Sequence, residues 1–521
     1  MKKDKMKLIL LFLSTVFLLL AGCGGQPAAS DPGHAESKVN ADQASSGQGG
    51  ELTIGYYADI SSYDPTLAAS GGDHSLLYFV YESLVNYSPN MEPLPGLAKS
   101  WEQKDDKTIV FHLQEGVTFQ DGTPFDAEAV KFNIERVNSD KSILTDLKTV
   151  ESVEVIDPLT AVFHLKQPDS GLILSLTERA GMMASPAAVK KYGDDYAAHP
   201  VGTGPYKLAK RVPNSEIQLE RYDRYWQKGK PSLDKITVKI MLQENTMINA
   251  LKSGEVQVIA PVTPQNIQVL QQSPNIALDI SPSLNFQNMF LNTSKPPLDK
   301  REVRLAIQYA LNREQLVKAL QFGQGEPAYS PFPQDHPVFD PAHVIPYDPQ
   351  KAKQLLEAAG VSGVTLDIIL KPDAFSLRLG EAVRAQLAQV GIKVNLHPTE
   401  VTKLTEEFFK EFKYPAAIAR ASNRPDPNQI LRLYYGGSSF YNPGKHANPA
   451  FEALLEKIAA TTDQKERAKL IGEATRIAMT EDAVGIPIFF EPMIVAMDKK
   501  VKGFEANLIG KPKFQFLSFE K

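Results

Sequence analysis

The sequence of 521 residues lacks several features that would assign it to particular classes of protein. It contains a single cysteine, Cys23, so no internal disulfide can form. Lysine and arginine (56 together) are slightly outnumbered by aspartate and glutamate (61), and no basic stripe is present. Nucleic-acid binding therefore has no electrostatic support. Beyond residue 20, no apolar run approaches the ~20 residues of a membrane-spanning helix, so the rest of the chain is expected to fold in water.

Motifs of catalysis are also missing. The sequence has no Gly-x-Ser-x-Gly elbow, no His-Glu-x-x-His pair and no phosphate-binding loop. We therefore expect a protein that is not an enzyme and that carries no cofactor. The only local cluster of metal-ligand types is Asp335, His336, Asp340 and His343. Its proline-rich surroundings and irregular spacing favour a plain loop over a metal site.

The first residues have the pattern of an export signal. A basic start (1–7) is followed by an apolar stretch (8–20) and by small residues before Cys23. The segment Leu-Ala-Gly-Cys (20–23) resembles a bacterial lipobox, whose cysteine receives a lipid and becomes the new N-terminus. The alternative is a chance cysteine in an ordinary signal peptide. We predict lipidation at Cys23, with more than one acyl chain because a single chain anchors weakly.

The next segment, 24–50, is rich in Gly, Ala, Ser, Gln and Asp and contains no aromatic residue. Such a composition cannot bury enough apolar surface to fold, so the segment is expected to be a flexible tether. The fold should begin near Glu51. The roughly 470 residues that follow are too many for one core and indicate two or three domains.

Two strand–helix–strand patterns, far apart in the sequence, indicate two separate α/β sheets. In each, an alternating strand precedes a helix with apolar residues at helical spacing, and a glycine separates that helix from a second strand. The first pattern comprises a strand at 236–241, a helix at 244–253 and a strand at 256–259; the second comprises a strand at 365–370, a helix around 379–390 and a strand at 392–396.

Capping residues mark further helices. Asn312 is predicted to cap a helix with Gln315 at the capping-box position, and Asn448-Pro449 to begin another. The similar alternating segments 108–113 and 160–165 are interpreted as paired strands of an antiparallel sheet rather than as a duplication.

Several blocks, in one order, resemble the family 5 extracellular solute-binding proteins, the dipeptide- and oligopeptide-binding group of ABC importers. The most specific block is DGTPFDAEAVKF at 121–132. The resemblance extends over nearly all of 51–521. The other blocks are YESLV (81–85), PLPGLAKSW (93–101), PVGTGPY (200–206) and PLDKREVR (297–304).

The resemblance implies an α/β bilobal fold of the type II periplasmic-binding-protein kind, with an extra domain inserted in the first lobe. Lobe one would comprise 51–282 and 486–521, with the inserted subdomain at about 81–199. Lobe two would comprise 283–485. The chain would cross between the lobes twice, as in a hinge that closes on a ligand.

The resemblance also implies a function and partners. The protein would capture a short peptide and deliver it to ABC permease subunits, which work with cytoplasmic ATPases. It would be monomeric and lipid-anchored, at a cell surface or facing the periplasm. Three alternatives stay open: a receptor for an opine-like anion, a receptor for a nickel chelate, and a peptide sensor.

In this family an aspartate of lobe two often receives the ammonium group of the peptide. Asp426, followed by Pro427, stands at the matching position, although Asp-Pro is also a common turn element. Relatives commonly carry a tryptophan shortly before that aspartate, where this chain has Arg420 and Ala421. Arg420 or Arg424 would then contact an acidic group of the ligand. The ligand would be an acidic peptide, an N-blocked peptide or another anion. The alternative is that both arginines lie at the surface or between the lobes.

A cation before the helix of the second strand–helix–strand unit would bind the carboxylate of the peptide in the dipeptide-type members. Lys371 is the nearest match and Arg378 the second, although each is also a plausible solvated side chain. Tyr441 and Asn442 follow the site loop and are expected to line the cleft, with a turn at Asn442-Pro443 as the alternative.

Overall fold

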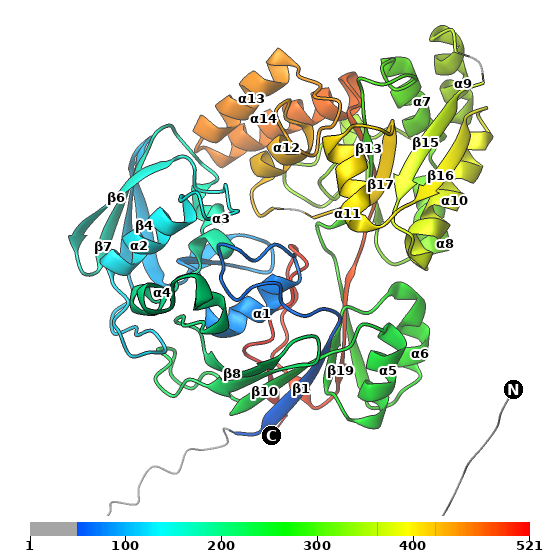
Figure 1. Cartoon of the computed structure of the whole chain (residues 1–521). Coiled ribbons are helices and arrows are strands. Elements are labelled where there is room, and N and C mark those ends of the chain that lie inside the picture. The colour runs from blue at the N-terminus through cyan, green and yellow to red at the C-terminus, as the bar shows by residue number, and fades with distance from the viewer. Residues whose placement is uncertain (1–48, 362, 423, 521) are drawn as a thin grey trace, which may run out of the picture. The chain divides into compact units, whose positions relative to one another are not determined.

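The computed structural model describes residues 49–520 except Ser362 and Asn423 (Figure 1). Within these residues the strands form a seven-stranded, a six-stranded and a four-stranded sheet, together with two short pairs, β2–β3 and β20–β21. The short pairs are β2 (Val85–Tyr87) with β3 (Pro93–Pro95) and β20 (Val501–Lys502) with β21 (Ser518–Phe519).

The seven-stranded sheet defines lobe one and has the order β12-β19-β11-β1-β10-β9-β8. Strand β1 lies at its centre and runs parallel to both β10 and β11, whereas the outer pairs are antiparallel. The strands are β1 (Glu51–Tyr56), β8 (Tyr206–Val212), β9 (Glu216–Arg221), β10 (Lys235–Ile240), β11 (Val258–Ala260), β12 (Ile276–Ser281) and β19 (Met493–Asp498), and the helices of this lobe include α1 (Asp73–Val80), α5 (Glu244–Ser253) and α6 (Ile267–Gln271).

The segment between α1 and β8 contains the four-stranded antiparallel sheet, in the order β4-β5-β7-β6, with its own apolar core. Val110 of β5 pairs with Val162 of β7, so the two similar sequence segments are neighbouring strands, as predicted. The elements here are β4 (Ala98–Asp105), β5 (Thr108–Leu113), β6 (Val150–Asp157), β7 (Thr160–Leu165), α2 (Ala127–Val137), α3 (Leu172–Ser175), the 3₁₀ helix η1 (Arg179–Gly181), α4 (Pro186–Tyr192) and η2 (Gly193–Ala198).

The six-stranded sheet defines lobe two and has the order β14-β18-β13-β17-β15-β16. Strand β15 is parallel to β16 and β17, and the remaining pairs are antiparallel. The strands are β13 (Phe286–Leu291), β14 (Glu326–Pro327), β15 (Thr365–Leu370), β16 (Lys393–Pro398), β17 (Ala416–Ala421) and β18 (Gly485–Phe490). The helices are α7 (Arg301–Ala310), α8 (Arg313–Leu320), α9 (Pro349–Ala358), α10 (Ala374–Ala388), α11 (Val401–Leu404), α12 (Pro427–Tyr435), α13 (Pro449–Ala460) and α14 (Gln464–Arg476), with the 3₁₀ helix η4 (Pro341–His343) and the π-helices η5 (Thr405–Lys410) and η6 (Ile477–Glu481). Lobe one contains the further 3₁₀ helix η3 (Pro264–Asn266).

Both strand–helix–strand units predicted from the sequence are present, one in each lobe. In the first, β10 and β11 flank β1, and Gly254 ends α5 with a φ of 79° that favours glycine. In the second, β15 and β16 are direct parallel neighbours. The helix α10 between them buries Leu379, Val383 and Leu387 completely, and burial of each such side chain stabilises the fold by about 1.5–3 kcal/mol.

The described chain crosses between the two larger sheets after β12 and after β18. The crossing segments are bonded to each other: the Glu491 N–H donates to the Asn285 carbonyl (2.9 Å), and the Ser283 hydroxyl donates to the Glu491 carbonyl (2.7 Å). The sequence places the second crossing after Gly485, but β18 pairs with β13 and β14 in the sheet of lobe two. The crossing therefore lies at Glu491 and Pro492.

The start of α8 shows one correction to the predicted capping. The Asn312 side chain accepts from the Gln315 N–H (2.9 Å), as an N-cap residue should. Gln315 does not return a bond to the Asn312 N–H, however. That donor is taken by the Gln386 side chain of α10 (2.9 Å), so a neighbouring helix completes the cap.

We predict that Asn312→Ala lowers the free energy of unfolding by about 1 kcal/mol, because the Gln315 N–H loses its acceptor. The matched variant Gln315→Ala should change it by less than ~0.5 kcal/mol, since Gln315 is exposed and does not cap. Urea unfolding of the full-length protein measures both. An equal loss in the two variants would contradict the observed cap.

Candidate functional site

A cavity of about 720 Å³ lies where the two lobes meet at the crossing segments. This volume is within the ~300–1,000 Å³ that small-molecule sites occupy. Both lobes and both crossings contribute to its lining. Lobe one provides Tyr56, Tyr57, Gly72, Ser75, Gln243, Glu244, Thr263, Gln265 and Lys511; the crossings provide Ser283, Asn285, Glu491 and Pro492; lobe two provides Leu320, Gln321, Asp373, Phe375, Arg378, Arg420 and Ser422.

The cavity lies at the carboxyl ends of the parallel strands of both sheets. Tyr56 is the last residue of β1, and Ala260 is the last residue of β11. On the other side, Asp373 precedes α10 after β15, and Ser422 follows β17. Open α/β sheets bind ligands outside the carboxyl ends of their strands. The fold therefore places the two ligand-binding edges opposite each other.

The acidic groups of the lining already have hydrogen-bond donors. Glu491 accepts from Gln287 Nε2 (2.8 Å), and its Oε2 forms an ion pair with Arg420 Nε (2.8 Å). Glu244 accepts from the Thr263 N–H (2.7 Å). Asp373 caps α10 by accepting from Ser376. These donors hold the carboxylates in the walls of the cavity, and acceptor positions remain for a ligand because an ionised carboxylate has about four of them.

Lys511, which lines the cavity, belongs to a buried polar cluster with His74 and Glu178. The Lys511 ammonium contacts Glu178 Oε2, and His74 Nε2 lies 2.7 Å from the same oxygen. Burial opposes ionisation of Glu178, but the Lys511 charge and His74 hold the pKa of Glu178 well below its usual range. Burial and the Lys511 charge lower the pKa of His74 to about 3, so His74 is neutral and acts as a donor.

The seven ligand contacts predicted from the sequence separate into two groups. Arg420 and Arg378 line the cavity, and Arg378 Nη2 reaches Gln265 Oε1 of the opposite lobe (3.4 Å). Five others are not among the lining residues of this cavity: Asp426, Arg424, Lys371, Asn442 and Tyr441. Lys371 follows β15 directly and is half-buried.

The surroundings of Asp426 give it a structural role, which speaks against the predicted ligand contact. Its side chain is 1% exposed, and Arg467 Nη2 donates to its Oδ2 (2.5 Å). Its Oδ1 caps α12 by accepting from the Gln429 N–H (3.1 Å). A Cβ added at Gly171 would lie 2.8 Å from the carboxyl carbon of Asp426, so the inserted subdomain covers this carboxylate.

Asn442 and Tyr441 stabilise the loop after α12 instead of lining the cavity. The Asn442 amide donates to the carbonyls of Gly436 (3.1 Å) and His446 (2.8 Å), which agrees with the alternative of a turn. Tyr441 packs against Phe290 and Tyr434.

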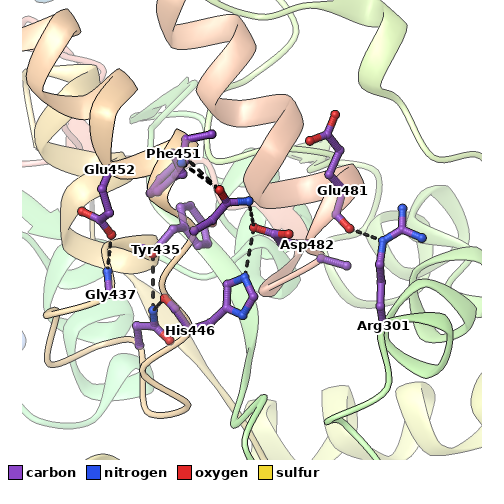
Figure 2. A network of polar contacts seen from close by, with 12 residues as sticks. Arg301, Tyr435, Gly437, His446, Phe451, Glu452, Glu481 and Asp482 are labelled. Atoms are coloured by element: carbon purple, nitrogen blue, oxygen red, sulfur yellow. Dashed lines mark hydrogen bonds and ion pairs between the residues drawn. The ribbon is translucent and has the colours of Figure 1, made fainter.

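Figure 2 shows how the same loop is held at its two ends. Glu452 accepts from the Gly437 N–H (2.7 Å), and His446 Nε2 lies 3.0 Å from Asp482 Oδ2. Burial raises the pKa of Asp482, but the contacts from His446 and Asn448 outweigh it and lower that pKa. The loop is thus fixed as part of the fold of lobe two.

The sequence reasoning missed Tyr57, Glu491 and Lys511 as lining residues. The positions of two of them could have been recognised from the sequence. Tyr57 directly follows the first strand, and Glu491 directly follows the last strand of lobe two. The rule that ligands bind at the carboxyl ends of strands points to such positions. Lys511 lies in the irregular C-terminal segment, where no local pattern marks it.

The remaining expectations concern metal, membrane and lipid. Among the residues that the structure describes, no group of three or more His, Asp or Glu side chains is placed to hold a metal ion. In the same part of the chain, no helix has the length and apolar character needed to cross a membrane. Cys23, the predicted lipidation site, lies outside the described residues.

We predict that Asp426→Asn lowers the free energy of unfolding by about 3–5 kcal/mol, because it leaves the buried Arg467 charge without its partner. The double variant Asp426→Asn/Arg467→Met should lose less than the single variant, since no unpaired charge remains. Chemical unfolding measures both. Unchanged stability in Asp426→Asn, combined with weaker ligand binding, would instead restore Asp426 to the binding site.

Comparison with known proteins identifies the family. The sequence model of the bacterial extracellular solute-binding proteins, family 5 (middle part), matches residues 92–442, which is more than half of the chain. The glutathione-binding protein GsiB of Salmonella paratyphi A is 29% identical over 479 residues, covering 87% of this chain and 91% of that protein.

Solved structures show the same relationship. The ABC transporter-associated periplasmic binding protein DppA of Helicobacter pylori, in complex with the peptide STSA, superposes with a TM-score of 0.80 at 27% identity, covering 91% of this chain and 99% of the other. The binding protein AgaA of A. tumefacien R10, in complex with agropinic acid, gives a TM-score of 0.79 at 26% identity, covering 91% and 99%. These relatives are binding proteins rather than enzymes. The chain therefore belongs to the family 5 bacterial extracellular solute-binding proteins, with the type II periplasmic-binding-protein fold, and is a solute-binding protein of an ABC importer.

Proposed function

We propose that this protein captures short peptides in the cavity between its lobes and delivers them to an ABC permease. The observation that carries the proposal is the mixed charge of the lining. A peptide has an ammonium and a carboxylate at opposite ends, and a cavity for it needs groups of both signs. The charged lining residues are the basic Arg378, Arg420 and Lys511 and the acidic Glu244, Asp373 and Glu491.

The rest of the lining suits a ligand whose side chains vary. Polar groups such as those of Tyr57, Gln243 and Asn285 can hydrogen-bond to a peptide main chain. Apolar side chains such as Leu320 and Phe375 offer contacts without directional requirements. A general peptide receptor needs this combination, because the main chain is common to its ligands and the side chains are not.

Closure of the lobes on the ligand would strengthen its charged contacts. The Arg378–Gln265 hydrogen bond already joins α10 of lobe two to η3 of lobe one across the cavity. Water excluded from such a site no longer screens the ion pairs, so each becomes stronger than at an open surface. The two crossing segments provide the hinge for this motion.

We predict that a subset of short peptides raises the melting temperature of the full-length protein purified in detergent. A ligand that binds only the native state stabilises it, by about 2.7 kcal/mol at 100 times its Kd. A differential scanning fluorimetry screen with di-, tri- and tetrapeptides measures the shift. Sugars serve as negative controls.

The second candidate is an opine-like anion, which the Arg378 and Arg420 guanidinium groups favour and which a relative of similar fold binds. Shifts by opine-type acids or nickel chelates, with none from any peptide, would overturn the peptide assignment and leave the importer role in place.

The proposal also includes attachment of the protein to a membrane through a lipid on Cys23. The support is the sequence pattern of an export signal with its lipobox-like segment, followed by a segment (24–50) whose composition predicts a tether. An anchored receptor has a raised effective concentration near its permease, and the tether leaves the lobes free to move. We expect it to act as a monomer, facing the cell exterior or the periplasm.

We predict that Cys23→Ala abolishes incorporation of a labelled fatty acid, because the acceptor thiol is removed. Metabolic labelling with an alkyne palmitate analogue, followed by N-terminal mass analysis, measures this in cells. Cys23→Ser, which keeps the size of the side chain, is the matched control and should also remain unlabelled. Labelling of either variant would contradict the assignment of Cys23.

A further inference from the structure

A contact outside the lining of the cavity joins the inserted subdomain to lobe two. It is centred on Ser170, in the turn before α3. The Ser170 N–H donates to the Ala459 carbonyl (2.8 Å), and the Ser170 hydroxyl donates to the Ile458 carbonyl (3.0 Å), both near the end of α13. Arg467 Nε of α14 donates to the same hydroxyl (2.8 Å). Ser170 thus bonds to two helices of lobe two, and α3 lies next to this group of helices in Figure 1.

Gly171, the next residue, allows the two parts to approach closely. A Cβ added at Gly171 would lie 2.8 Å from Cγ of Asp426 and 3.0 Å from its Oδ1. The backbone at Gly171 (φ −89°, ψ −10°) is one that alanine adopts without strain. The absence of a side chain is therefore required by the approach of Asp426 and not by the turn.

A further bond extends the contact along α3 and α12. The Gln429 amide of α12 donates to the Ser175 hydroxyl at the end of α3 (2.5 Å). This bond, the bonds of Ser170 and the packing at Gly171 together make up the Ser170 contact. All of its partners belong to the chain itself, so the contact forms without any ligand.

The inserted subdomain is held firmly to the rest of lobe one. Gln120 Nε2 donates to the carbonyls of Gly204 (3.0 Å) and of Tyr206 in β8 (2.7 Å). Arg136 of α2 forms an ion pair with Asp64, which precedes α1. A motion that separates lobe two from lobe one must therefore also break the Ser170 contact.

The contact lies apart from both the ligand cavity and the crossing segments. Ser170, Gly171, Asp426 and Arg467 are not among the residues that line the cavity. The Asp426 and Arg467 side chains are 1% and 5% exposed, and separation of the lobes would uncover the Gly171 side of Asp426 and remove the Ser170 hydroxyl from Arg467. Bonds that exist only when the lobes are together stabilise the closed state over the open one.

We propose that the Ser170 contact holds the lobes closed over the cavity, and that Ser170 and Gly171 are positioning residues for solute capture. A ligand that binds only the closed form has an apparent Kd equal to its intrinsic Kd divided by the closed fraction. Weakening the contact lowers that fraction, so it raises the Kd of every ligand by the same factor and leaves selectivity unchanged. The inference goes beyond the proposed function, because it requires two lobes that close and no particular ligand.

Hydrogen–deuterium exchange of the ligand-free, full-length protein in detergent tests the contact directly. The Ser170 N–H is a natural reporter, since its acceptor belongs to lobe two. Gly171→Ala should speed exchange of the segment 169–172 by about 10-fold, because its Cβ has no room against Asp426. Ser170→Ala, which keeps the N–H and removes the hydroxyl bonds, should act in the same direction.

Gly472→Ala is the matched control, at a glycine of α14 where an added Cβ would meet no heavy atom within 4 Å. Its exchange at 169–172 should equal that of wild type, as should its affinity for ligand. In all three variants the strands β5 and β7 should exchange as in wild type. Faster exchange of these strands in Gly171→Ala, with a lower melting temperature, would identify a defect in the inserted subdomain and overturn the positioning role.

Calorimetry with trialanine, and with mannopinic acid as a chemically different probe, connects the contact to capture. Gly171→Ala should raise the Kd of each probe that binds wild type by about 10-fold, with the same factor for both. Unchanged exchange at 169–172, or faster exchange with an unchanged Kd, would overturn the proposal. Failure of trialanine to bind wild type would count against peptide capture and leave the exchange test of the contact unaffected.

Discussion

The pair of hydrogen bonds between the two crossing segments is the constraint on which the rest of the molecule depends. Ser283 and Asn285 on one segment form hydrogen bonds with Glu491 on the other. The two segments that connect the lobes are therefore hydrogen-bonded to each other. This connection holds the carboxyl edges of both sheets opposite each other. It also makes the floor of the cavity: Ser283, Asn285 and Glu491 all line it.

The charge arrangement of the cleft follows from that geometry. Glu491 lies on a crossing segment and pairs with Arg420 of lobe two, so the hinge and the wall of the site share one ion pair. The cations of the lining also have partners within the protein: Lys511 contacts Glu178, and Arg378 donates to Gln265. A ligand that bonds to Arg378 of lobe two and to Tyr57 of lobe one would join the two lobes, and such differential contacts are what stabilises a closed state over an open one.

The fold could be predicted from the sequence further than the site could. The strand–helix–strand units were visible because Leu379, Val383 and Leu387 repeat at the helical period, and Gly254 and Gly391 mark where helices end. Local patterns do not report on distant partners. The Gln386 side chain, from a different helix, accepts the Asn312 N–H that Gln315 was predicted to bind. Similarly, β18 belongs to lobe two because it pairs with β13, which is remote in sequence.

The same limit explains Asp426. Its Asp-Pro motif at the start of a helix was readable, and it does cap α12, but Arg467 and Gly171 reach it from other parts of the chain and bury it. Arg420 was recognised because it departs from the family pattern, and it does lie on the cavity. The positions of Glu491 and Lys511 on the cavity depend on contacts with residues distant in sequence, Arg420 for the one and Glu178 for the other.

The most direct test of the central claim is to identify the ligand that accompanies the full-length protein when it is purified gently from its membrane. Native mass spectrometry, followed by denaturation and fragmentation of the released molecule, gives its mass and composition. The account predicts a short peptide. A sugar, an opine-type acid or a nickel chelate would contradict peptide capture.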